Sequence, residues 1–454
     1  MRISLVLFLL ISAASFAQQI PAPTDLPDDP FYIKKTWPIV GTRDSLNYLA
    51  LDPEQLHLYL AYRWKITVDD LESGATIGTI SGTHGAYGMA LDDTAEFGYL
   101  SDGQFNQIDV FDRRSLKVVG IIPTAPNPTI VLFEPASALI FVICNQPLQE
   151  KFDKTHTIHG VSGNERLRSG LTVDELLELS PPRLSSLHPR AAKPAPLPES
   201  NWFLTVIDAE TWKALADIQL PGKVAFAQTA GNGHVYLGFP DRSEIARLDA
   251  VELREKLLGN FEGIPAAKGH TPKEVQLLSG RVFEPDSKWT RDPGQTLSWS
   301  SPPLASEDGV RPIIFFHLQR ECADPRTLAV DEHHLRLFVA CGDMKLAVLN
   351  AENGIQEAML PTGPDTKAVA YDFDRQFVYA ANAGGNGSLT FIRQDVTDTY
   401  KVIQNLPTPH WARALAINPV TGQIYLMTDY TDSDSQQRLS SDDRGSFQLL
   451  LIAH

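Results

Sequence analysis

The sequence predicts an all-β fold, a seven-bladed β-propeller whose blades are four-stranded antiparallel sheets. Three observations lead to this prediction. A unit of about 40 residues recurs, each unit is made of short β-rich segments between turns, and the last unit lacks a strand that the N-terminal region supplies. The composition, 43% hydrophobic and 21% charged, is typical of a folded globular chain.

The recurring unit begins with an apolar strand that ends in an acidic or amide residue before a polar turn. The chain reads LALDPEQLHLYLAY from Leu49, and the pattern returns at MALDDTAEFGYL, VLFEPASALIFVIC, TLAVDEHHLRLFVAC, AVAYDFDRQFVYAAN and ALAINPVTGQIYLM. The landmark residues, spaced by 40, 42, 197, 41 and 46 positions, are Asp52, Asp92, Glu134, Asp331, Asp372 and Asn418. A helical repeat would show apolar residues every three or four positions, whereas these segments are short β-rich runs between Gly, Pro, Asp and Asn turns.

The long spacing between Glu134 and Asp331 contains two stretches that do not repeat, 147–200 and 262–321. Without them the spacing is about two periods, so one further unit must lie between them. That unit is visible from Val224 to Ala250 and brings the total to seven. We therefore predict insertions at 147–200 and 262–321.

The last unit offers only three strands and ends with FQLLLIAH at His454. The segment YIKKTWPIV, from Tyr32 to Val40, precedes the first full blade and is predicted to supply the missing outer strand. Strands from both terminal regions would then close the ring and leave no open edge between first and last blades. A single propeller domain is predicted over 31–454.

The N-terminal segment has the pattern of a secretory signal peptide. Met1-Arg2 is followed by an apolar run over 3–11 and by Ser15-Phe16-Ala17, a small-x-small cleavage site. We expect residues 1–17 to be removed, 18–30 to form a Pro-rich linker, and the mature protein to be periplasmic or secreted. The apolar run is too short to span a bilayer, so no transmembrane anchor is expected in the mature chain.

The net charge of −16, with no basic run, makes nucleic acid an unfavourable partner. The chain has three cysteines, which in an oxidising compartment can form one disulfide. Cys322 and Cys341 are the candidate pair, which would leave Cys144 buried. The alternative is three reduced thiols in the core, because cysteine is among the most buried residue types.

The units resemble the YVTN-type, YncE-like seven-bladed propellers of exported bacterial proteins, over nearly all of 31–454 outside the two insertions. The tetrapeptide that names this family is degenerate here, reading YLAY, YLSD, FVIC, YLGF, FVAC, YAAN and YLMT. The resemblance implies the fold and leaves the function open, because relatives include binding proteins, sugar-lactone hydrolases and propellers that serve haem or quinone electron transfer.

In a propeller, the loop that enters each blade and the loop between its second and third strands lie on one face. The stretches 147–200, 262–321 and 430–445 are all predicted to converge there, and long loops in compact domains are often functional. The predicted ligand-binding residues of this face are Tyr62, Arg63, Asn127, Asn145, Asp365, Asn382 and Arg413. They would bind a protein, a peptide or a small polar ligand. The alternative for each residue is a local turn-capping role.

The leading hypothesis from the sequence is therefore an exported binding or interaction module. The alternative is a hydrolase or lyase that acts on a lactone or sugar-like substrate, and its candidate acid-base or metal-holding residues are His84, His410, Asp102 and Asp429. A third hypothesis is an accessory of haem or quinone redox chemistry.

No cofactor is predicted, and a covalent c-type haem is disfavoured because the chain contains no C-x-x-C-H motif. His156 and His159 form an H-x-x-H pair in the first insertion, and this spacing allows two imidazoles to face one metal ion. They are candidate metal ligands, with solvated loop histidines as the alternative.

Overall fold

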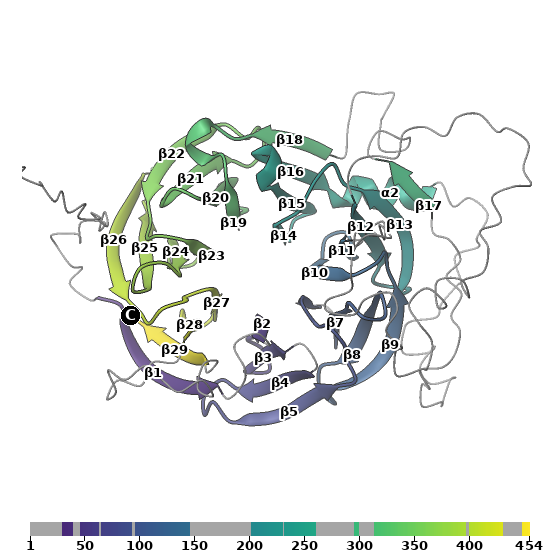
Figure 1. Ribbon diagram of the computed structural model, residues 1–454, viewed down its shortest axis with the longest axis horizontal. Coiled ribbons are helices and arrows are strands. Elements are labelled where there is room, and N and C mark those ends of the chain that lie inside the picture. Colours follow the sequence, from purple (N-terminus) through teal and green to yellow (C-terminus); the bar gives the residue numbers. More distant parts are fainter. Residues whose placement is uncertain are drawn as a thin grey trace, which may run out of the picture.

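The computed structural model arranges the chain as a ring of seven β-sheets around a central axis (Figure 1). The predicted all-β, seven-bladed propeller is thereby confirmed. The structure describes residues 30–39, 46–62, 65–92, 96–145, 201–229, 231–259, 295–298, 313–395, 399–429 and 447–454. The predicted signal peptide and the predicted insertion at 147–200 lie outside these residues.

Each blade is built from an inner strand near the axis, two middle strands and an outer strand. Blade one contains β2 (Leu46–Asp52), β3 (His57–Tyr62), β4 (Lys65–Asp70) and β5 (Thr76–Ser81). Blade two contains β6 (Met89–Leu91), β7 (Phe97–Asp102), β8 (Gln107–Asp112) and β9 (Lys117–Pro123). Blade three contains β10 (Pro128–Glu134), β11 (Leu139–Asn145), β12 (Trp202–Asp208) and β13 (Lys213–Gln219), with β17 (Gln295–Ser298) added outside β13.

The remaining blades follow the same plan. Blade four contains β14 (Phe226–Thr229), β15 (His234–Phe239), β16 (Glu244–Asp249) and β18 (Ile313–His317). Blade five contains β19 (Pro325–Asp331), β20 (Arg336–Cys341), β21 (Lys345–Asn350) and β22 (Gln356–Pro361). Blade six contains β23 (Thr366–Asp372), β24 (Phe377–Asn382), β25 (Ser388–Gln394) and β26 (Tyr400–Pro407). Blade seven contains β27 (Ala414–Ile417), β28 (Ile424–Asp429), β29 (Phe447–Ala453) and β1 (Tyr32–Ile39). The helical elements are η1 (Pro240–Arg242), α2 (Ala250–Gly259) and η2 (Arg320–Cys322).

The second predicted insertion, 262–321, is wrong at its C-terminal end. β18 (Ile313–His317) lies within that range and pairs antiparallel with β16, so it is the outer strand of blade four. The connection from β16 to β18 therefore joins the third and fourth strands of one blade, and it does not enter blade five. β17 (Gln295–Ser298), also from this range, pairs in parallel with β13 as a fifth strand of blade three.

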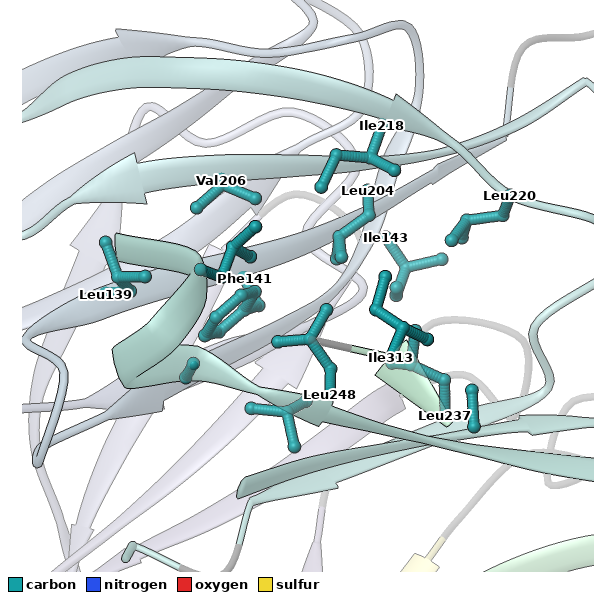
Figure 2. Close-up of a cluster of buried hydrophobic side chains, with 14 of the residues drawn as sticks. Leu139, Phe141, Ile143, Leu204, Val206, Ile218, Leu220, Leu237, Leu248 and Ile313 are labelled. Atoms are coloured by element: carbon teal, nitrogen blue, oxygen red, sulfur yellow. The ribbon is translucent and has the colours of Figure 1, made fainter. Parts of the chain in front are cut away.

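The core lies between neighbouring blades. In the cluster between blades three and four, Phe141, Leu204 and Leu237 are fully buried and come from strands of both sheets (Figure 2). Middle strands pack between two other blades and are apolar on both faces, as in β7 and β11, where nearly every residue is buried. Outer strands such as β5 keep mostly exposed residues. This difference explains why the middle strands gave the clearest sequence pattern.

Blade seven combines strands from distant parts of the chain. β1 pairs antiparallel with β29 from Tyr32–Ala453 to Ile39–Phe447. Phe31, immediately before β1, is buried and stacks on Phe391 of blade six with ring centroids 4.0 Å apart. Its amide donates to Gln404 Oε1 at 2.8 Å, and Gln404 Nε2 donates to the Phe31 carbonyl at 2.8 Å. The start of β1 is thus tied to the outer strand of blade six.

Candidate functional site

The two faces of the ring are distinguished by the connections that they carry. We define the entry face as the one that holds the connections between blades and those from the second to the third strand of a blade. The turn face holds the first-to-second and third-to-fourth turns. The antiparallel order of the four strands in each blade places these connections alternately at opposite ends of the sheet.

On the entry face of blade two, the structure brings His84 and Asp102 together. Asp102 lies at the end of β7 and is fully buried. Its Oδ2 accepts a hydrogen bond from the His84 amide at 3.0 Å, and its Oδ1 accepts from the amides of Gln104 and Phe105, each at 3.1 Å. Because both oxygens accept backbone N–H groups, the carboxyl positions the β5–β6 and β7–β8 connections relative to each other.

The His84 imidazole lies beside the same carboxyl, with Nδ1 3.7 Å from Asp102 Oδ2. Burial raises the pKa of Asp102, and the hydrogen bonds from Phe105 and His84 oppose that effect. Both residues were predicted as acid-base candidates. Their geometry is that of a buried carboxyl that orders two loops.

Two aromatic side chains next to Asp102 were not named from the sequence. Phe105 is 52% exposed and Tyr87 is 38% exposed. The Phe105 ring makes an edge contact with the His84 ring, with centroids 5.2 Å apart. Tyr87 is placed by its amide, which donates to Ser101 Oγ at 3.0 Å.

Gly103, the residue after Asp102, lies close to the Tyr87 ring and to Asn127. A Cβ atom at Gly103 would lie 3.0 Å from Asn127 Oδ1, 3.4 Å from the Gly85 carbonyl and 3.7 Å from the Tyr87 ring. Asn127 enters from blade three, and its amide donates to Asn106 Oδ1 at 2.8 Å. Tyr87 and Asn127 thus lie beside Gly103, and the contacting rings of His84 and Phe105 belong to residues whose backbone amides are bonded to the neighbouring Asp102. We call His84, Tyr87, Phe105 and Asn127 the blade-two aromatic surface.

A second buried carboxyl, also missed from the sequence, lies near Asp102 in the same blade. Asp109 of β8 is 2% exposed, and its Oδ1 accepts from Gln107 Nε2 at 2.7 Å. Burial raises the pKa of Asp109 to about 7, and the nearby charge of Asp102 adds to this shift. An acidic residue in the middle of the otherwise apolar run QIDVFD was the available sequence signal.

On blades five and six, Asp365 takes part in a network of ion pairs. Lys367 Nζ lies 2.9 Å from Asp365 Oδ1, and Arg326 of blade five donates to the same oxygen. Arg326 also pairs with Asp324 at 3.0 Å. The neighbouring Asn382 is fully buried, and its side-chain amide is hydrogen-bonded within the blade. Thr366 donates to its Oδ1 at 2.8 Å, and its Nδ2 donates to Thr390 at 2.9 Å. This part of the entry face has charged side chains at the surface and a buried, fully hydrogen-bonded asparagine below them.

Other predicted residues occupy the same face without joining a common cluster. Asn145 Oδ1 accepts from Asn201 Nδ2 at 3.3 Å at the end of β11. His410 is exposed on the connection into blade seven, and the Arg413 guanidinium lies 5.0 Å above the Phe447 ring. Arg63, His156 and His159 lie outside the described residues, as do the side chains of Tyr62 and Asp429.

The structure joins Cys322 and Cys341 in a disulfide. Cys322 belongs to η2, on the connection into blade five, and Cys341 ends β20, so the bond fixes an entry-face loop to a middle strand. Cys144 is buried, with its sulfur 3.7 Å from Thr205 Oγ1.

The prediction that all three long segments converge on the entry face is wrong for the second one. The β16–β18 connection begins with α2, whose Arg254 donates to the Ser137 carbonyl and pairs with Asp208 at 3.0 Å and Glu210 at 2.7 Å. Ser137 and Glu210 belong to turns of blade three on the turn face. The other two long connections, 146–201 and 430–446, leave β11 and β28 at the entry face.

Within the described parts of the chain, no group of three or more His, Cys, Asp or Glu side chains is arranged to hold a metal ion. Among the same residues, no helix has both the length and the apolar character needed to cross a membrane.

Comparison with known proteins identifies the fold only. No protein-family model and no curated protein matches the sequence. Among solved structures, the chain is similar to the RRP9 WD40 repeats, with a TM-score of 0.56 and 8% identity over 93% of this chain and 100% of that one. It is also similar to U3-55K, with a TM-score of 0.54 and 9% identity over 91% and 98% of the two chains. A chain of the mitotic checkpoint complex is similar as well, with a TM-score of 0.56 and 10% sequence identity over 97% of this chain and 99% of that one.

These similarities agree with the WD40-like propeller architecture. At such identities they define the shape of the scaffold, and the function must be argued from the site.

Proposed function

We propose that this chain is an exported β-propeller that acts as a binding or interaction module through its entry face, and that it is related to the YVTN-type propellers of bacteria. The observation that carries the proposal is the ordered entry face of blade two, where a buried carboxyl holds two loops and presents exposed aromatic rings. Polar and aromatic side chains held on a rigid scaffold are the usual elements of a recognition surface.

The position of the long connections supports the same face. The β11–β12 and β28–β29 connections both leave the ring there, and long loops on a rigid scaffold commonly carry recognition. On blades five and six, the ion pairs of Asp365 with Arg326 and Lys367 add charged groups to the same face.

Export is supported by the signal-peptide pattern of residues 1–17 and by the Cys322–Cys341 disulfide, since disulfides persist mainly in oxidising compartments. N-terminal sequencing of the mature protein from its native source should begin at Gln18. A chain that keeps Met1 would contradict export by this signal.

The test of the entry face is a comparison of two shortened proteins. In one, residues 147–200 on the entry face are replaced by a short Gly-Ser linker. In the control, residues 260–294 between α2 and β17 are replaced by a linker that preserves α2, β17 and β18. Each protein is immobilised, and proteins captured from the exported fraction of its source are quantified by mass spectrometry.

The proposal expects captured partners to be lost from the first variant and kept by the control. Undiminished capture by the first variant would show that the 147–200 connection does not contribute to binding. Loss from the control alone would move the binding site to the turn face.

A further inference from the structure

Two buried carboxyls in blade two lack a cationic partner. Asp102 is bonded to backbone amides and lies beside His84, and Asp109 is bonded to Gln107. Within the described parts of the chain, neither carboxyl is paired with a lysine or an arginine. No lysine or arginine of the described residues therefore offsets the negative charge that these carboxyls carry when they are ionised.

Three buried carboxylates on the turn face have an arginine partner. Asp52 is bound by Arg113 at 2.6 Å, Asp208 by Arg254 at 3.0 Å, and Asp372 by Arg375 at 3.2 Å. Each of these arginines belongs to a turn or helix of the same face. Glu134, also buried on the turn face, is bonded instead to the amides of Ser137 and Gly233, so an arginine partner is frequent there and not universal. What distinguishes blade two is that Asp102 and Asp109 are close enough for their charges to interact.

Asp102 is bonded to the loop backbone that carries an exposed aromatic ring, and Asp109 lies near Asp102. Asp102 accepts the amide hydrogen of Phe105, whose ring is 52% exposed, and Asp109 is close enough to Asp102 for their charges to interact. The exposed Tyr87 ring approaches Gly103, the residue that follows Asp102. The faces of aromatic rings carry negative potential, so rings and carboxyls act in the same direction.

We propose that the blade-two aromatic surface binds an arginine or lysine side chain from a basic segment of a protein partner. The cation would lie against the Phe105 and Tyr87 rings, and Asp102 and Asp109 would attract it. The net charge of −16 favours the approach of a basic partner over an acidic one. This inference rests on the proposed function, because it names the chemistry of the partner that the entry face receives.

The experiment uses the full mature chain and a labelled probe, the peptide acetyl-(Arg-Gly)4-amide, with (Gln-Gly)4 and (Glu-Gly)4 peptides as neutral and acidic comparisons. Fluorescence anisotropy at low salt gives the dissociation constants. The arginine peptide should bind most tightly. Phe105→Ala and Tyr87→Ala should each weaken its binding about threefold to tenfold, the range of a cation–π contact.

Three variants separate this site from general attraction to an acidic protein. Phe373→Ala removes an aromatic side chain that is 42% exposed on the turn face, and it should bind the peptide as the unmodified chain does. Phe105→Leu keeps an apolar side chain without a π face and should behave as Phe105→Ala. Asp109→Asn removes a carboxyl without exposing the core and should also weaken binding.

Equal binding by Phe105→Ala, Phe105→Leu and the unmodified chain would overturn the inference, as would tighter binding of the neutral peptide. These outcomes are distinguishable from failure of the proposed function. If the aromatic variants leave peptide binding unchanged while removal of 147–200 abolishes partner capture, the entry face binds a partner by other chemistry. If the peptide binds at Phe105 while partner capture survives that removal, the 147–200 connection has no part in recognition.

Discussion

Asp109 occupies a strand position that holds threonine in other blades. By strand register, Thr205 of blade three and Thr390 of blade six are its equivalents. Thr205 donates to Asp217 at 2.6 Å, so a hydroxyl suits this buried position. A carboxylate at this buried position has little contact with water, which disfavours the charged form. Burial therefore raises the pKa of Asp109 to about 7.

This shift makes Asp109 a source of pH-dependent stability. Its pKa in the folded protein is about 7, above the value of about 4 expected in the unfolded chain, so the folded state binds the proton more strongly. The contribution of Asp109 protonation to the free energy of unfolding is complete below about pH 4 and is lost as the pH rises through about 7. Asp109→Asn does not ionise, so its stability relative to the unmodified chain should increase over that range by about 1–4 kcal/mol.

Urea unfolding at pH 4.5, 6 and 8 tests this expectation. The control is Asp374→Asn, which changes an exposed carboxyl and should give a nearly constant difference. A difference for Asp109→Asn that does not change with pH would show that the carboxyl ionises as easily in the fold as in the unfolded chain.

Among the elements, the turns of the turn face connect neighbouring blades. Arg113, after β8 of blade two, is buried and donates through Nε and Nη2 to Asp52 at the end of β2 in blade one. Its Nη1 also donates to the Asp92 carbonyl at 2.8 Å. The landmark acid of blade one is thus satisfied by a cation from blade two, which gives a structural reason for an acid at position 52.

Arg113→Met should destabilise the protein by about 3–5 kcal/mol, because it leaves the Asp52 carboxylate buried without its cation. The double variant Asp52→Asn/Arg113→Met should recover part of that loss. Arg114→Met is the matched control, because Arg114 is 72% exposed and pairs with Glu96 at the surface, where a pair contributes less than about 1 kcal/mol. Urea midpoints compare the variants, and equal effects for Arg113→Met and Arg114→Met would refute the argument.

Strand-level prediction succeeded where the repeat was uninterrupted and failed where the chain leaves a blade midway. β18 was assigned to an insertion because about 60 residues separate it from β16, and a strand is recognised more easily beside its neighbours. Blade four also has Thr229, not an acid, at the end of its first strand. The parallel pairing of β17 with β13 depends on a contact between distant segments that local pattern does not encode.

The candidate site was predictable in outline and not in detail. Blade topology alone was enough to assign His84, Asp102 and Asn127 to one face. The sequence did not reveal that Asp102 accepts backbone amides from two loops, because hydrogen-bond partners depend on loop conformation. Tyr87 and Phe105 were missed because an exposed aromatic residue in a loop has the same sequence signature as one packed inward.

For the whole molecule, closure of the ring depends on a contact between residues far apart in the chain. Phe31 and Gln404 are 373 positions apart, yet their two hydrogen bonds and the stacking of Phe31 on Phe391 fix the start of β1 against blade six. β1 itself completes blade seven. Phe31 therefore adds a buried ring and a backbone contact to the hydrophobic cluster that blades six and seven share.

Phe31→Ala should destabilise the propeller by about 3–5 kcal/mol, because it removes a buried ring from an aromatic cluster. Tyr32→Ala, at the next position, removes a ring that is 49% exposed and should change stability by about 0.5 kcal/mol or less. Thermal unfolding followed by near-ultraviolet circular dichroism compares them. Similar melting temperatures for the two variants would mean that Phe31 is not required for closure.

The pairing of β1 with β29 also determines when blade seven can form during synthesis of the chain. Residues 32–39 emerge early from the ribosome, but their partner strand, 447–453, is synthesised after six blades have been made. Until then β1 presents an unpaired edge, a hazard for aggregation that a binding chaperone would remove. The ring can therefore close only after β29 has been synthesised, so truncated or stalled chains keep the edge of β1 unpaired.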